Sequence, residues 1–264
     1  MNDITIVSAF FNFKKNKYNS NDIYKFWGSN LFPNLNKNLV VFTDEDCYDF
    51  ICSLRIDNLK EKTRIIKIKI EDFYMYKYID YLKKDLERDH EKSYHNIELY
   101  MIWNEKMSFI KKAIELNFFN SSYYAWCDFG YVRNPNYNDL YMQNFPNVEN
   151  LIENKIYMLN IDYNFTINDF LDPFNKNYRY ISNIIGAGFI IGKKELLINM
   201  IDIYYNKIMT HYIDNDMFIG KDQTLFVSLY LSNPNLVKLI KGDNDHFCYP
   251  LCEFKWFYFL KFLK

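Results

Sequence analysis

Short runs of β-branched and aromatic residues alternate along this chain of 264 residues with longer segments whose apolar residues recur at helical spacing. The runs at 4–11, 39–43, 123–129 and 155–160 are each short enough and apolar enough to predict a buried strand. Strands that alternate with helices predict an α/β protein with a mostly parallel central sheet flanked by helices. With no internal repeat and no linker, residues 1–264 are predicted to form a single domain.

The remaining segments fill in this pattern. Helical spacing predicts helices at 22–32, 193–212 and 222–231, and two helices within the charged stretch 73–116, separated near residues 90–93. The acids and histidines around that break, in Asp89-His90-Glu91 and Tyr94-His95-Asn96, are expected to lie on solvated faces. Further strands are expected at 64–70, at 181–191 as a strand pair or a strand bent around two glycines, and at 235–240.

Composition and charge exclude several classes of protein. A net charge of -1 argues against a general nucleic-acid binder, and no apolar run reaches the ~20 residues of a membrane helix. The N-terminus carries an acid where a signal peptide needs positive charge. Five cysteines without a CxxC pair predict free thiols in a reducing, cytoplasmic compartment. The aromatic and lysine-rich segment 254–264 predicts a core helix, with peripheral membrane attachment as the alternative.

The segment YYAWCDFGYVR, residues 123–133, carries the strongest chemical signal. Its Asp-Phe-Gly letters also occur in protein kinases, but no GxGxxG loop and no HRD motif precede them, which excludes that class. Asp128 directly follows an apolar strand, which fixes its carboxylate as a ligand for Mn²⁺ or Mg²⁺ beside a leaving diphosphate. Gly130 would let phosphates approach the backbone, and Arg133 would add a forked contact to them. Alternatively, Asp128 caps a turn and Arg133 pairs with a surface acid.

Six short segments can be compared with known families: ITIVSAFF, LVVFTD, WNEK, YAWCDFGYVR, GAGF with Gly192, and Asp222-Gln223. They occur in the order seen in the HtrL/YibB family, over roughly residues Ile4 to Leu231. That family resembles a divergent branch of the GT-A glycosyltransferases, so the resemblance implies a GT-A-like, nucleotide-diphospho-sugar transferase fold. WCDFG would correspond to the metal-binding DxD element, with Gly130 in place of the second aspartate and one carboxylate left for the ion.

The resemblance implies a role for each segment. The nucleotide-sugar site would comprise Ser8, Ala9, Phe10, Phe11, Thr43, Asp44, Lys106, Asp128, Arg133, Gly186, Ala187 and Gly188. Asp222 and Gln223 would be catalytic, and Asp128 and His246 would hold the metal. Simpler roles remain open from the residues alone: a helix N-cap for Asp44 or Asp222, a solvated helix lysine for Lys106, a bulge at the glycines, and a surface loop around His246.

The predicted function is transfer of a sugar from a nucleoside diphosphate sugar, with UDP-sugars favoured, to a hydroxyl acceptor with the help of a divalent metal. Asp222 would act as base in an inverting enzyme, or would stabilise an oxocarbenium-like centre in a retaining one. One alternative is a catalytically inactive nucleotide-sugar-binding module on the same fold, because the DxD element is reduced. A metal-dependent hydrolase that uses the same acids is a further alternative.

Overall fold

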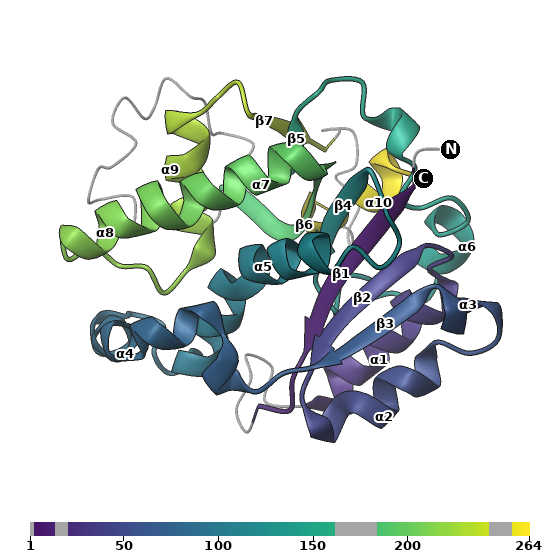
Figure 1. The fold of residues 1–264 in the computed structure, drawn as a ribbon, viewed down its shortest axis with the longest axis horizontal. Helices are drawn as coiled ribbons and strands as arrows, with labels where there is room; N and C mark the ends of the chain where they lie inside the picture. Colours follow the sequence, from purple (N-terminus) through teal and green to yellow (C-terminus); the bar gives the residue numbers. More distant parts are fainter. Residues whose placement is uncertain (1–2, 14–20, 162–183, 243–254) are drawn as a thin grey trace.

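The computed structural model describes residues 3–13, 21–161, 184–242 and 255–264. They form an α/β structure around one seven-stranded sheet, with helices on both faces (Figure 1). The strand order across the sheet is β3-β2-β1-β4-β6-β5-β7. The strands are β1 (Ile4–Phe10), β2 (Asn38–Thr43), β3 (Thr63–Lys67), β4 (Tyr123–Cys127), β5 (Ile156–Asn160), β6 (Ile185–Lys193) and β7 (Val237–Lys241).

The sheet is mixed, so the prediction of a mostly parallel sheet is wrong. β1, β2, β3 and β4 pair in parallel, and β5 pairs in parallel with β7, but β6 runs antiparallel to both of its neighbours, β4 and β5. Eight of the nine β6 positions are not exposed, so the strand shows no alternation of apolar and polar residues. A run buried on both faces looks the same in either direction, and its direction cannot be deduced from the pattern.

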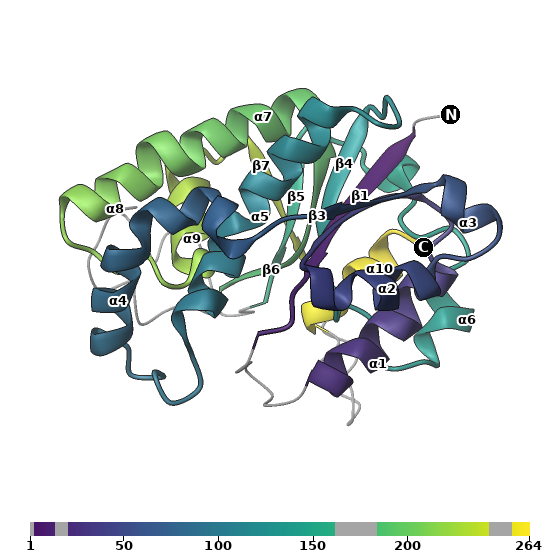
Figure 2. The same cartoon turned by 60° about the horizontal axis from the view of Figure 1, so that its bottom comes forward.

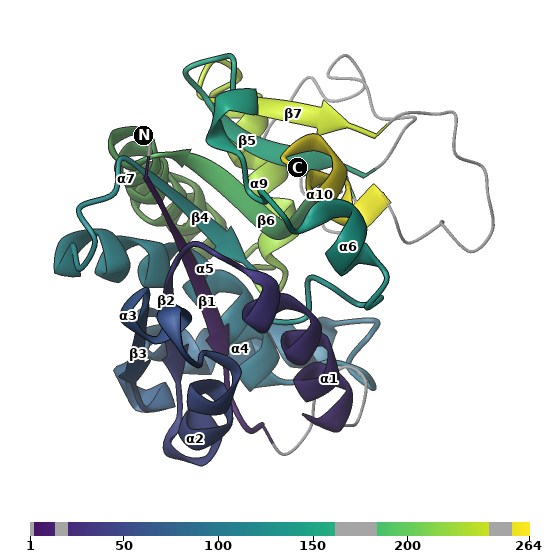
Figure 3. The same ribbon diagram turned by 90° about the vertical axis from the view of Figure 1, so that its right-hand side faces the viewer.

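Two layers of helices cover the sheet (Figures 2 and 3). One layer holds α4 (Ile79–Arg88), α5 (Ile97–Leu116), α7 (Lys194–Ile203), α8 (Thr210–Asp214) and α9 (Asp222–Ser232). The other holds α1 (Asn21–Leu31), α2 (Glu45–Leu54), α6 (Tyr137–Tyr141) and α10 (Phe259–Phe262), with the short α3 (Asn58–Glu61) at the end of the sheet beside β3. A π-helical segment, Tyr204–Met209, joins α7 to α8 without a break, so the helix predicted at 193–212 is confirmed.

The alternation of side chains along the strands explains the two layers. On β1, Val7 and Ala9 join the core beneath α5, whereas Ile6 and Phe10 join the core beneath α1 and α2. The same division holds along β4, where Trp126 lies in the first core and Cys127 in the second. Both faces of these central strands are therefore buried, as their apolar runs predicted.

The C-terminal segment belongs to the core, as predicted. Phe259, Leu260 and Leu263 are fully buried in the layer that contains α1 and α2. Among the described cysteines, Cys47, Cys52 and Cys127 are free thiols. Within the described ranges, no helix has the length and apolar character needed to cross a bilayer.

A buried arginine ties β3 to the turn after α1. Arg55 is 2 % exposed, and its guanidinium donates to Thr63 Oγ1 at 2.8 Å and to the carbonyls of Phe32, Leu35 and Lys37 at 2.6–3.0 Å. We expect Arg55→Met to lower the free energy of unfolding by about 3 kcal/mol, because it leaves buried carbonyls without donors. Urea denaturation measures this change. Arg64→Met, at an exposed arginine nearby, should lower the free energy of unfolding by no more than about 0.5 kcal/mol. Equal losses of stability in the two variants would contradict the structural role of Arg55.

Candidate functional site

The antiparallel β6 brings two distant segments of the chain together at one edge of the sheet. Because β6 runs against β4, its first residues lie beside the last residues of β4, with Cys127 opposite Phe189. The Asp128 amide donates to the Gly188 carbonyl at 2.8 Å. The carboxyl end of β4 and the beginning of β6 therefore form one wall, which is the type of location where α/β sheets bind ligands.

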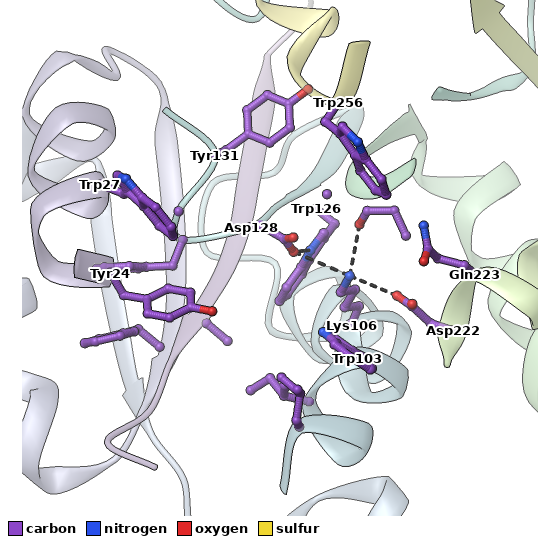
Figure 4. Close-up of a pocket in the computed structure, with 18 of the residues that line it drawn as sticks. Tyr24, Trp27, Trp103, Lys106, Trp126, Asp128, Tyr131, Asp222, Gln223 and Trp256 are labelled. Atoms are coloured by element: carbon purple, nitrogen blue, oxygen red, sulfur yellow. Dashed lines mark hydrogen bonds and ion pairs between the residues drawn. The ribbon is translucent and has the colours of Figure 1, made fainter. Parts of the chain in front are cut away.

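A buried lysine stands at the centre of this wall. The Lys106 ammonium, from the middle of α5, lies 2.9 Å from Asp222 Oδ2 and 3.5 Å from Asp128 Oδ1, and donates to the Ala187 carbonyl at 3.1 Å. Asp222 is the first residue of α9, and its neighbour Gln223 donates from Nε2 to the Ile185 carbonyl at 2.9 Å. Figure 4 shows Asp128, Lys106 and Asp222 in a row. Lys106 is not a solvated helix lysine, since it is 4 % exposed.

The three charges depend on one another. Burial alone would lower the pKa of Lys106, but the two carboxylates outweigh it and the pKa is raised. Burial raises the pKa of Asp222, and the Lys106 ammonium opposes that shift. Lys106 therefore remains protonated and compensates the charge of Asp222, which is 4 % exposed.

The two oxygens of Asp128 differ in their surroundings. Oδ1 accepts a hydrogen bond from Trp126 Nε1 at 2.6 Å and faces Lys106. Oδ2 lies 3.3 Å from the point where a Cβ on Gly188 would stand, and no described residue donates a hydrogen bond to it. The side chain of Asp128 is 45 % exposed. One oxygen is thus held rigidly while the other is available, and a carboxylate oxygen is a suitable ligand for Mn²⁺ or Mg²⁺.

These groups face a cavity of about 560 Å³, a volume typical of small-molecule sites. Tyr24 and Trp27 of α1 lie on the opposite side of Asp128 from Asp222 and Gln223, so the site has two distinct ends (Figure 4). Much of the wall is aromatic, and it includes Phe10, Phe11, Phe13, Tyr24, Trp27, Trp103, Trp126, Phe129, Tyr131, Trp256 and Phe257. Flat apolar walls with a few charged groups suit a ligand with rings and ionised groups.

Most of the residues proposed from sequence line this cavity, namely Ala9, Phe10, Phe11, Lys106, Asp128, Arg133, Ala187, Gly188, Asp222 and Gln223. Ser8 and Gly186 do not line it. Ser8 is fully buried within β1 opposite Val41, and Gly186 packs against Ile161 and Leu159. His246 lies outside the described residues.

Thr43 and Asp44 also lie away from the cavity and have structural roles. The Thr43 hydroxyl donates to the Phe10 carbonyl at 2.7 Å. Asp44 is the N-cap of α2, where Oδ1 accepts from the Cys47 amide at 2.9 Å and Oδ2 accepts from the Asn12 amide at 2.6 Å. The simpler alternative, an N-cap, is therefore the observed one, and Asp44 orients the loop after β1 without lining the cavity.

Gly130 lines the cavity, and its expected role beside phosphates stays a prediction. A Cβ at Gly130 would lie 2.7 Å from Trp27 Cε3, so the side of its backbone where a side chain would stand is filled by the indole ring. Arg133 is nevertheless in the cavity wall, where its guanidinium lies 4.4 Å from the centre of the Trp27 ring and 5.0 Å from that of Phe257. Such stacking holds a guanidinium flat against the wall of the cavity.

The prediction that the polar residues around the break between α4 and α5 are solvated is wrong for Asp89 and His95, whereas His90, Glu91 and Tyr94 are exposed as expected. Asp89 and His95 are 9 % and 3 % exposed, and His95 Nδ1 lies 2.6 Å from Asp89 Oδ2. Tyr100 donates its hydroxyl to the same oxygen, and Lys221 pairs with Glu91. His95, Glu91 and Lys221 all line the cavity. A local sequence signal for this burial is the aromatic pair Tyr100 and Trp103, one turn apart just after His95.

This cluster is bound together by hydrogen bonds. One potential ligand atom from each of Asp89, Glu91 and His95 lies within 4.8 Å of the others. However, Asp89 already accepts from Tyr100 and His95, and the Lys221 ammonium at Glu91 would repel a cation. The contacts favour a neutralised network of donors and acceptors over a cation site.

The fold and the cavity thus define an α/β protein with a lysine-bridged pair of carboxylates at the carboxyl end of a central strand. Residues 2–249 match the family described as "Bacterial protein of unknown function (HtrL_YibB)", and the chain belongs to that family, as the sequence resemblance predicted. It is also similar to "Protein HtrL" of Escherichia coli (strain K12), with 26 % identity over 257 residues that cover 89 % of this chain and 86 % of that protein.

The ion pairs of Lys106 make a prediction about stability. We expect Lys106→Met to lower the free energy of unfolding by about 3 kcal/mol, because Asp222 remains buried without its partner. The double variant Lys106→Met/Asp222→Asn should recover part of that loss, since the stranded charge is removed. Denaturant titration of the four proteins of this cycle measures the coupling. Lys111→Met, at an exposed position of the same helix, is the matched control and should change the free energy of unfolding only slightly. If Lys106→Met has an effect as small as Lys111→Met, the role of Lys106 in compensating Asp222 is contradicted.

Proposed function

We propose that this chain is a GT-A-like glycosyltransferase that moves a sugar from a nucleoside diphosphate sugar, with UDP-sugars favoured, to a hydroxyl acceptor. The observation that carries the proposal is Asp128. Its carboxylate follows a buried strand, one oxygen is fixed by Trp126, and the other is available at a cavity of about 560 Å³. A rigid carboxylate of this kind suits a cation that must hold a diphosphate in a fixed position.

The two ends of the cavity suit the two parts of such a donor. Tyr24 and Trp27 offer aromatic faces for a base, and Arg133 beside them offers positive charge for the phosphates. On the other side of Asp128, Lys106 and Asp222 would lie beside the sugar (Figure 4). Mn²⁺ or Mg²⁺ at Asp128 would act as a Lewis acid on the leaving diphosphate. The second predicted ligand, His246, lies outside the described residues.

The contacts of Asp222 and Gln223 define what each would contribute. Asp222 keeps Lys106 charged and in place. Its Oδ2 already faces this ammonium, which argues against a role for Asp222 as proton acceptor. Gln223 holds the start of β6 through the Ile185 carbonyl and thereby fixes the wall at Ala187 and Gly188.

One observation favours the second candidate, a nucleotide-sugar-binding module without turnover. Lys106 pairs with both carboxylates of the site, and a neutralised site binds ligands without needing to react with them. A metal-dependent hydrolase fits the site less well, because Asp128 is the one carboxylate at this end of the cavity that keeps an available oxygen among the described residues.

Thermal unfolding with a panel of nucleotides tests the proposal. We expect UDP and UDP-sugars in the presence of Mn²⁺ to raise Tm by several degrees, because a ligand at about 100-fold excess over its Kd stabilises the native state by ~2.7 kcal/mol. Asp128→Ala should abolish the part of the shift that depends on Mn²⁺. The matched control is Asp72→Ala, at an exposed aspartate outside the cavity.

Release of UDP, measured with each UDP-sugar that shifts Tm, separates the two candidates. Turnover supports the transferase, whereas a Tm shift without any release of UDP favours the binding module. The proposal is contradicted if no nucleoside diphosphate sugar shifts Tm, or if Asp128→Ala and Asp72→Ala leave the same Mn²⁺-dependent shift.

A further inference from the structure

A histidine with a carboxylate behind it lines the same cavity as Asp128 and Asp222. His95 Nδ1 donates to Asp89 Oδ2 at 2.6 Å, and the Asp89 carboxylate also accepts from the Tyr100 hydroxyl and from the Glu91 amide. These contacts fix the ring and, in the neutral imidazole, place its proton on Nδ1. Nε2 then keeps a lone pair, and among the described residues it has no hydrogen-bond partner.

Several contacts attach the segment that carries His95 to the start of α9. Glu91 pairs with Lys221, which directly precedes Asp222. From α4, Asp85 accepts from the Ile219 amide at 2.7 Å, and Arg88 donates to the Asp216 carbonyl at 3.0 Å. His95 is therefore held on the same side of the cavity as Asp222 and Gln223.

The helix that carries Lys106 also supports the ring. Trp103 lies one turn before Lys106 on α5, and the His95 ring meets the Trp103 indole edge to face, with 5.1 Å between ring centres. His95, Trp103 and Lys106 all line the cavity. The imidazole is thus positioned by a carboxylate on one side and an indole on another, which is the kind of support that a reacting group requires.

A hydroxyl acceptor must lose its proton as it attacks, and the carboxylates near the donor are poorly suited to take it. Asp222 is committed to the Lys106 ammonium, and Asp128 is the proposed metal ligand. His95 offers a neutral nitrogen with a free lone pair, which is the most common proton acceptor in enzyme sites. Its Asp89 partner would stabilise the imidazolium that forms.

We propose that His95 is the general base of the transfer, an inference that rests on the proposed glycosyltransferase function. The acceptor oxygen forms a bond to the anomeric carbon of the donor, and its proton passes to His95 Nε2. The bond from that carbon to the diphosphate oxygen breaks, and its electron pair leaves with the nucleoside diphosphate. The imidazolium then returns its proton to water. Asp89 is a positioning residue, since it acts through His95.

The charges that face the ring define how the reaction depends on pH. The charged groups around the ring are Asp89, Glu91 and Lys221, and the Tyr100 hydroxyl holds Asp89 in place. Nε2 must keep its lone pair to accept a proton, so the rate should fall when acidic solution protonates that nitrogen. A variant without this imidazole should lose that acidic limb.

Hydrolysis of UDP-glucose, UDP-galactose and UDP-N-acetylglucosamine, with water as acceptor, provides the test. We expect His95→Gln to lower kcat about 100-fold or more and to remove the acidic limb of the pH profile, with Kd for UDP changed less than threefold. Asp89→Asn should give a smaller loss of kcat with the same unchanged Kd. Added imidazole should restore activity to His95→Ala but not to His95→Gln, whose side chain fills the site.

His90→Gln is the matched control, because His90 is exposed in the same segment and does not line the cavity. Circular dichroism and Tm establish that each variant is folded. If the wild type releases UDP and His95→Gln does so at the same rate with the same pH profile, the inference is overturned while the proposed function stands. If the wild type neither binds nor hydrolyses any donor, the proposed function fails and the inference fails with it.

Discussion

The ammonium group of Lys106 holds two carboxylates and a backbone carbonyl together where water scarcely reaches. It joins α5 to the end of β4 through Asp128, to the beginning of β6 through Ala187, and to the start of α9 through Asp222. Uncompensated charges in this position would cost several kcal/mol, so these elements must meet for Lys106 and Asp222 to be buried. The contacts of the Lys106 ammonium therefore both stabilise the core and form one wall of the cavity. The stability of the fold and the geometry of the site depend on this one charge.

The antiparallel β6 makes this contact possible. In an all-parallel sheet the end of β6, and not its beginning, would lie beside Asp128, and the small residues Ala187 and Gly188 would stand at the far edge. Because β6 is reversed, a glycine faces Asp128 Oδ2 and leaves that oxygen accessible from the cavity. Trp126, two residues earlier on the same strand, then fixes the other oxygen. The geometry at Asp128 thus depends on strand direction as much as on residue identity.

The sequence predicted the parts of this structure that depend on local pattern. Buried runs located β1, β2, β4 and β5, helical spacing located α1, α7 and α9, and a carboxylate after an apolar strand marked Asp128 as lining a site. The direction of β6 could not be predicted, because a strand buried on both faces carries no directional signal. Asp44 was ambiguous, since a cap and a ligand contact use the same side chain. Asp89 and His95 were mistaken for solvated residues, because their burial depends on the segment before α9 as well as on Tyr100 and Trp103, and only the fold brings that segment to them.

The most direct test of the central claim is a crystal structure with UDP and Mn²⁺. The account predicts anomalous density for manganese about 2.0–2.3 Å from Asp128 Oδ2, in contact with the diphosphate, with the base against Tyr24 and Trp27 and the Lys106 ion pairs intact. Nucleotide bound elsewhere on the molecule, or manganese with no contact to Asp128, would contradict it.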